Sequence, residues 1–215
     1  RLDLPFGSTA DLAWALGPAT TSPLDGADGA WAEGFRAAYP AFDALAGCEG
    51  EAAAPERVAV VTMCWGEAHA ARLPLWLRAL QLARRVLTTL VMCFDLAALA
   101  SCRGAHADPR LCADARAWPA SSLSKLAALA LCVARNVSAL WLDTDAVVLR
   151  DPVPFLEPML PVATAGTPRP ELLFSVEADS WNCINSGIFL ARATRAVRRY
   201  LGYWMSLLLE RPVTS

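Results

Sequence analysis

Short apolar runs alternate with longer amphipathic segments along most of the chain. The short runs are rich in β-branched and large apolar side chains, which is typical of buried strands. The predicted strands are 58–64, 86–95, 139–142, 171–179 and 186–193. The predicted helices are 67–85, 121–136, 151–159 and 192–210. This alternation predicts an α/β fold, with a mostly parallel sheet flanked by helices.

Three local features refine these elements. Pro74, within the first predicted helix, favours either a kink or a later helix start. Asn136 is a residue that commonly ends a helix in the left-handed conformation. The stretch 96–118 shows no clear period, and we predict that it is irregular.

Residues 1–56 differ from the rest of the chain because they are rich in Gly, Pro, Ala and Asp. We interpret them as a low-complexity linker or stem, with a short amphipathic helix in 31–45 that Pro40 breaks. Residues 57–215 form the folded domain. We expect the sequence to be an excerpt whose domain is truncated at the C-terminus. No uncharged apolar run approaches the ~18–20 residues of a membrane helix, so any anchor would lie outside the excerpt.

Composition narrows the function classes. The net charge is −2 and the basic residues form no stripe, so the sequence offers no nucleic-acid footprint. None of the seven cysteines is paired as C-x-x-C, which argues against a zinc site. A disulfide between Cys102 and Cys112 is an option in an oxidising compartment. Asn136 also begins an N-glycosylation sequon, which would fit a lumenal protein.

Two carboxylates, Asp143 and Asp145, interrupt an apolar stretch and form a D-x-D motif. On extended backbone, residues two apart face the same way, so these carboxylates would repel each other. A divalent cation removes the repulsion, and Mg²⁺ or Mn²⁺ binds one or two carboxylates together with phosphate oxygens. The alternative is a solvated turn with local hydrogen bonds.

The position of the motif supports a binding site. If the strand ends at Leu142, the motif lies where α/β sheets bind ligands, beyond the carboxyl ends of the strands. Asp95 and Asp179 are the last residues of two other predicted strands and would converge on the same edge.

Two enzyme families place D-x-D after an apolar strand. Haloacid-dehalogenase-like phosphatases use the first aspartate, here Asp143, as a phosphoryl nucleophile. Their motif usually follows the first strand and is paired with a downstream acidic pair. This chain places two predicted strands earlier and shows no such pair after Asp151.

The other family fits more closely. Residues 122–156 contain a lysine-bearing helix, an apolar strand, D-x-D and then Arg-Asp-Pro, and residues 174–204 contain Ile-Asn-Ser-Gly leading into an aliphatic strand. This order resembles the nucleotide-diphospho-sugar transferase family that includes plant arabinosyl- and xylosyltransferases (glycosyltransferase family 77). The resemblance covers roughly 57–206 and implies a GT-A, Rossmann-like fold.

The resemblance also implies roles for individual residues. Asp145 would be the main ligand of Mn²⁺ or Mg²⁺, and Asp143 would contact the ribose, or the metal through water. Both would be catalytic, because the metal at this motif stabilises the negative charge that develops on the leaving nucleotide diphosphate. The nucleotide and donor residues would be Thr62, Asp95, Lys125 and Thr144. The donor-sugar or acceptor wall would comprise Asp179, Asn185, Ser186 and Gly187.

Most of these roles have a structural alternative. Thr62 can cap the following helix, and Asp95 can be a structural acid. Lys125 can be a solvated surface residue, and Asn185–Gly187 a β-bulge. His69 and His106 are expected at the surface rather than as ligands.

The resemblance therefore implies a metal-dependent, retaining glycosyltransferase. It would move a sugar from a nucleotide diphosphate, with UDP the expected carrier, to a glycan or glycoprotein in the Golgi lumen. Such enzymes often complete the metal shell with a histidine further along the chain than this excerpt reaches. A catalytically incomplete domain that binds sugar nucleotides is therefore the alternative outside catalysis.

Overall fold

The computed structural model describes residues 40–45, 58–82, 88–116, 118, 122–146, 148–150, 152, 170–176 and 184–210. Within these ranges the chain forms a six-stranded sheet with the order β3-β2-β1-β4-β6-β5. Its strands are β1 (Val58–Cys64), β2 (Thr89–Cys93), β3 (Cys112–Asp114), β4 (Ser138–Leu142), β5 (Leu172–Val176) and β6 (Ile184–Ala191). The predicted strands are confirmed, with ends that differ by a few residues.

The sheet is mixed but mostly parallel. β3, β2, β1 and β4 are successive parallel neighbours. β6 is antiparallel to both β4 and β5, so among the described strands it alone runs against the others. The predicted α/β class with a mostly parallel sheet is confirmed, and it is compatible with a Rossmann-like fold. Apolar periodicity predicts a strand but not its direction, which is why β6 was not distinguished.

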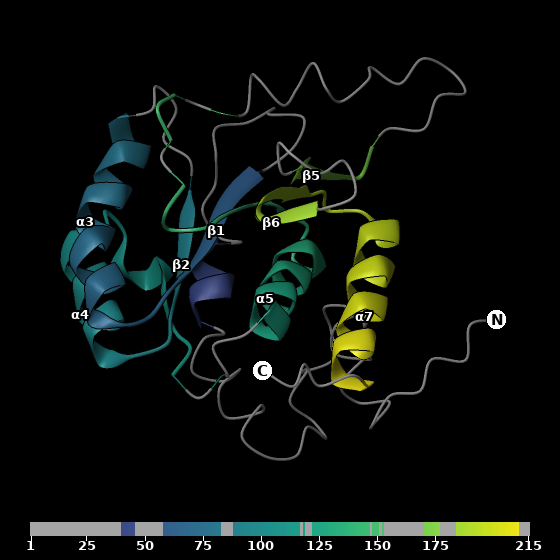
Figure 1. Ribbon diagram of the computed structural model, residues 1–215, viewed down its shortest axis with the longest axis horizontal. Helices are drawn as coiled ribbons and strands as arrows, with labels where there is room; N and C mark the ends of the chain where they lie inside the picture. The colour runs from purple at the N-terminus through teal and green to yellow at the C-terminus, as the bar shows by residue number, and fades with distance from the viewer. Residues whose placement is uncertain are drawn as a thin grey trace.

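Helices cover both faces of the sheet (Figure 1). They are α3 (Glu67–Leu82), α4 (Leu96–Ala105), α5 (Ser122–Ala134) and α7 (Arg195–Glu210). α3 and α4 pack on one face, where they bury apolar residues such as Val60 and Leu140. α5 and α7 pack on the other face over Val61 and Trp141. Successive residues of a strand therefore pack into two separate cores, because their side chains point to opposite faces of the sheet.

The chain changes direction between β1 and β4. From β1 it runs outward through α3, β2 and α4 to β3, and then returns through α5 to β4 on the other side of β1. The chain passes from β1 to β2 across the face that α3 covers, and from β3 to β4 across the opposite face, which α5 covers. The strand order therefore reverses between β1 and β4, which makes the β1–β4 boundary a topological switch point. In open α/β sheets, ligands bind beyond the carboxyl ends of the strands at such a point.

The prediction that 96–118 is irregular is wrong. This stretch holds α4, a 3₁₀ turn (Pro109–Leu111) and the edge strand β3. Asp95 is the N-cap of α4, and its side chain accepts a hydrogen bond from the backbone N–H of Ala98. Asp95 also fits the end of a strand, so its role as a helix N-cap was not predicted. The strand β3 is too short to show a period.

The predicted disulfide option is realised between Cys102 and Cys112, which joins α4 to the edge strand β3. The described free cysteines, Cys64, Cys93 and Cys132, are buried as expected. Burial raises the pKa of the Cys132 thiol to about 12. These thiols therefore pack as small apolar side chains.

The helix α3 begins at Glu67, so a later start at Pro74 is excluded. Proline has no N–H to donate to the carbonyl of the residue four positions earlier, which is Ala70. In the structure the hydroxyl of Ser101 on α4 donates to this carbonyl, with an oxygen–oxygen distance of 2.6 Å. The defect that Pro74 introduces is thus repaired by the neighbouring helix.

Replacing Ser101 with alanine should lower the free energy of unfolding by about 1–2 kcal/mol, because the half-buried carbonyl of Ala70 loses its donor. The same change in a Pro74→Ala background should cost less than half as much, since residue 74 then supplies the N–H. Urea denaturation of the four proteins measures both values. Equal costs in the two backgrounds would show that Ser101 does not compensate for the proline.

The predicted left-handed end of α5 is confirmed. Asn136 has φ 59°, and the N–H of Val137 donates to the carbonyl of Cys132, as in a Schellman motif. This cap turns the chain directly into β4.

Packing reaches N-terminal of residue 57. Residues 40–45 are helical, and Phe42 and Leu45 are buried in the core beneath α5. Arg135 forms an ion pair with Asp43 at 2.9 Å and lies over the Phe42 ring. The rest of the predicted 31–45 helix, and the predicted helix 151–159 apart from Pro152, lie outside the described residues. No helix within the described ranges is long and apolar enough to cross a membrane.

Candidate functional site

The D-x-D motif lies immediately after β4, at the switch point. The N–H of Asp143 still donates to the carbonyl of Gly187 on β6, at 2.9 Å. The N–H of Ala146 then donates back to the carbonyl of Asp143, which closes a turn over residues 143–146. This 143–146 turn confirms that the strand ends at Leu142. It contradicts the prediction that Asp143 and Asp145 share a face on extended backbone.

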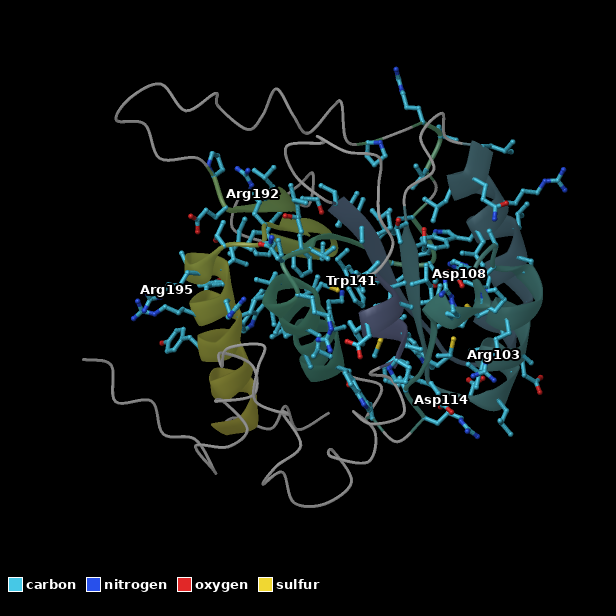
Figure 2. The ribbon with its side chains drawn as sticks, turned by 180° about the vertical axis from the view of Figure 1, so that it is seen from behind. Arg103, Asp108, Asp114, Trp141, Arg192 and Arg195 are labelled. Atoms are coloured by element: carbon cyan, nitrogen blue, oxygen red, sulfur yellow. A yellow bond between two sulfur atoms is a disulfide. The ribbon has the colours of Figure 1, made fainter. Side chains whose placement is uncertain are left out.

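A buried cation and an indole hold the Asp143 side chain. The Nε1 of Trp141 donates to Oδ1 of Asp143 at 2.6 Å, and the Nζ of Lys125 lies 3.3 Å from the same oxygen. The Lys125 ammonium also lies 4.7 Å from the centroid of the Trp141 ring. Lys125 lies in α5, Trp141 in β4 and Asp143 directly after β4. Figure 2 shows Trp141 in the middle of the molecule between the helical layers.

Lys125 is therefore not the solvated surface residue that one alternative described. Its side chain is 8% exposed, against 37% for Asp143. Burial lowers the pKa of Lys125, while the charges of Asp143 and Asp145 oppose that change. An ammonium this buried needs an anionic partner, and Asp143 provides it. The charge of Asp145 acts on the same amine, so the three ionisable groups of the site lie together.

Trp141 and Lys125 contact one of the four carboxylate oxygens of the motif, Oδ1 of Asp143. Asp145 is exposed. Within the described residues, Oδ2 of Asp143 and the carboxylate of Asp145 accept no hydrogen bond. Hard oxygen ligands of this kind suit Mg²⁺ or Mn²⁺.

No group of three or more His, Cys, Asp or Glu residues that could hold a metal ion occurs in the described ranges. Magnesium sites that use one or two carboxylates take their other ligands from water and substrate phosphates. The two aspartates therefore fit a metal that binds together with a diphosphate. They do not fit a closed, all-protein metal site.

The 143–146 turn is also tied to α3. The hydroxyl of Thr144 lies 3.4 Å from Nδ1 of His69, and the Nε1 of Trp76 donates to the carbonyl of Ala146 at 2.8 Å. His69 is exposed, as expected, yet it contacts the motif. The two residues are 75 apart in sequence, so the sequence did not predict this contact. The feature that points to it is that α3 directly follows the central strand β1.

Thr62 is fully buried within β1, on the face that α3 covers. Its Oγ1 has no hydrogen-bond partner among the described residues, so the alternative in which it caps the next helix is wrong. Its register places it beside Val91 of β2, inside the sheet rather than at its edge.

Asp95 lies at the same edge of the sheet, but β1 separates its strand from β4. One carboxylate oxygen accepts from Ala98 and the other from the N–H of Gly66. These hydrogen bonds hold the pKa of Asp95 below its usual range. The structural alternative describes the observed contacts of Asp95, which fixes the loop after β1 to the start of α4.

The predicted sugar wall is described only in part. Asn185, Ser186 and Gly187 lie in β6, near its start. Among the atoms of these residues that the structure describes, the carbonyl of Gly187 contacts the motif. Pairing with β5 jumps from Phe189 to Asn185, so the β-bulge alternative is present in this strand. Asp179 and the side chains of Asn185 and Ser186 lie outside the described residues.

His106 is half-buried, so it is only partly at the surface, where it was expected. Its Nδ1 accepts from the N–H of Asp108, and its Nε2 bonds the carbonyl of Thr89. Burial lowers the pKa of His106, which suits the neutral ring that this pair of hydrogen bonds requires.

A scan against protein-family models, a search of curated proteins and a search of solved structures each found no match to this chain.

Proposed function

We propose that this chain is a metal-dependent glycosyltransferase domain that binds a nucleotide-diphosphate sugar, with UDP as the expected nucleotide. The observation that carries the proposal is the placement of the D-x-D motif. Asp143 and Asp145 occupy a turn at the carboxyl end of a central parallel strand, at the topological switch point. They stand beside a buried lysine whose charge complements anionic groups.

The motif residues divide the work between them. Trp141 and Lys125 fix one oxygen of Asp143, so its other oxygen keeps a defined direction. Asp145 is exposed and supplies the more accessible carboxylate. Mn²⁺ or Mg²⁺ bound by these carboxylates would supply Lewis acidity to the diphosphate that departs. The ammonium of Lys125 would offset the negative charge that develops on the same group.

The acceptor in this proposal is a glycan or glycoprotein, and the chemistry retains the anomeric configuration. Gly187 marks the β6 side of the motif, which is where we place the sugar. The disulfide fits an oxidising compartment such as the Golgi lumen. These assignments rest on the resemblance of the motifs to nucleotide-diphospho-sugar transferases.

Calorimetric titration with UDP and with GDP, each with and without Mn²⁺, tests the proposal. We expect binding of UDP that requires Mn²⁺. Release of UDP from a panel of UDP-hexoses and UDP-pentoses would then identify the donor. Binding without release from any of them would favour a domain that binds sugar nucleotides without turnover.

Asparagine in place of Asp143 separates the transferase from a phosphatase. In a phosphatase this aspartate is the nucleophile. The wild type would then hydrolyse p-nitrophenyl phosphate, and Asp143→Asn would not. In a transferase we expect no such hydrolysis, and binding of UDP with Mn²⁺ weakened by about 10-fold rather than lost. Mg²⁺-dependent phosphatase activity that Asp143→Asn removes would contradict the proposal.

A further inference from the structure

An exposed aromatic pair stands next to the D-x-D motif. Trp65 directly follows β1 and is 42% exposed. Its ring stacks on His69 of α3, with centroids 5.8 Å apart and planes 26° apart. Phe94, which directly follows β2, meets the Trp65 ring edge-on at 6.5 Å. The Trp65–His69 pair therefore lies at the carboxyl ends of the central parallel strands.

A single exposed tryptophan on a protein surface would need no explanation. Here the loop that carries the tryptophan has a defined backbone conformation. Gly66 has φ +77°, a conformation that other residues rarely adopt, and its N–H is held by the Asp95 carboxylate. A Cβ at Gly66 would meet nothing within 4 Å, so the backbone conformation, and not a lack of space, favours glycine here. The loop thus presents an aromatic surface in a fixed position.

His69 links this surface to the motif. Its Nδ1 lies 3.4 Å from the hydroxyl of Thr144, within the 143–146 turn. The aromatic pair therefore begins at the turn and extends toward β2, whereas Gly187 and β6 lie on the other side of the turn. The site has carboxylates in the middle, flat rings on one side and β6 on the other.

This order of groups matches one class of ligand. A nucleoside diphosphate sugar has a planar base at one end, a charged diphosphate in the middle and a sugar at the other end. We infer that the Trp65–His69 pair is the stacking platform for the nucleotide base, so that the base lies over the ends of β1 and β2. The inference rests on the proposed function and adds residues that the sequence motifs do not indicate.

Stacking on an aromatic ring tolerates different bases, because every base presents a π-face. The platform therefore contributes affinity for UDP and GDP alike, but none for pyrophosphate, which has no base. This difference separates the role of Trp65 from that of the carboxylates, which act on all three probes.

Calorimetry with UDP, GDP and pyrophosphate, each with Mn²⁺, tests the platform on the wild type, Trp65→Ala and Trp65→Phe. We expect Trp65→Ala to lower the affinity for UDP and for GDP by about 10-fold or more and to leave the affinity for pyrophosphate unchanged. Trp65→Phe keeps a ring and should recover most of the affinity. Tyr203→Ala is the matched control, because Tyr203 is an aromatic residue of similar exposure, 39%, on α7.

The outcomes distinguish the platform from the proposed function. UDP binding that needs Mn²⁺ but is unaffected by Trp65→Ala would overturn the platform and leave the metal–diphosphate site intact. Equal weakening of UDP and pyrophosphate would also overturn it, because Trp65 would then act on the diphosphate end. If the wild type binds pyrophosphate with Mn²⁺ but neither nucleotide, the platform is overturned as well. If it binds none of the three probes, the proposed function fails and the platform falls with it.

Discussion

Asparagine at position 145 will abolish the Mn²⁺-dependent part of UDP binding, with a loss of affinity of about 100-fold or more. The reason is that Asp145 supplies the accessible carboxylate of the motif and, among the described residues, makes no hydrogen bond that asparagine would break. Even changes in residues that merely orient metal ligands typically cost about 10- to 100-fold in metal affinity. Calorimetric titration with UDP at fixed Mn²⁺ measures the loss.

The matched control for this variant is Asp114→Asn. Asp114 ends the parallel strand β3 just as Asp143 follows β4, but β3 lies at the far edge of the sheet, and Arg116 pairs with its carboxylate at 2.8 Å. Figure 2 places Asp114 away from Trp141. We expect wild-type UDP affinity for Asp114→Asn, and an unchanged thermal midpoint for Asp145→Asn because its side chain is exposed. Wild-type binding by Asp145→Asn would remove the metal–diphosphate site from the 143–146 turn.

Loss of the Cys102–Cys112 disulfide will produce the largest change in stability. The bond joins residues 10 apart in sequence and fixes α4 to the edge strand β3. Closing a loop of that size stabilises a fold by about 2–4 kcal/mol, chiefly through the unfolded chain. The Cys102→Ala/Cys112→Ala double variant should therefore unfold roughly 5–15 °C below the wild type. Differential scanning calorimetry measures this difference.

Dithiothreitol provides the internal control. It should lower the midpoint of the wild type to near that of the double variant and leave the double variant unchanged. Exchange with the neighbouring thiols should be slow, because burial raises the pKa of Cys64 to about 11 and that of Cys93 to about 12. A wild-type midpoint that does not respond to reductant would mean that the bond contributes nothing to stability.

The buried lysine connects stability with function at the site. Without a partner, an ammonium as buried as Lys125 would be costly, so the fold favours an arrangement in which the Asp143 side chain lies close to it. The Trp141 ring beneath the ammonium restricts where it can lie. Asp143 is thus oriented before any ligand binds, which reduces the ordering that binding must impose.

The sequence alone determined the features that depend on neighbouring residues. Apolar runs fixed the strands, because their side chains must alternate between two buried faces. The left-handed end at Asn136 was readable because few residue types tolerate that conformation. The position of the D-x-D motif after an apolar strand could also be predicted, because the strand and the motif are adjacent in sequence.

Only the tertiary structure decided the features that depend on residues distant in sequence. The direction of β6, the burial of Lys125 against Asp143, and the contact between His69 and Thr144 each join separate elements. The position of the motif is another example, since the carbonyl of Gly187 on β6 holds the N–H of Asp143 where the 143–146 turn begins. Periodicity records which face of an element is apolar, but not which partner covers it. The strand order that brings β4 beside β1 therefore assembled the candidate site.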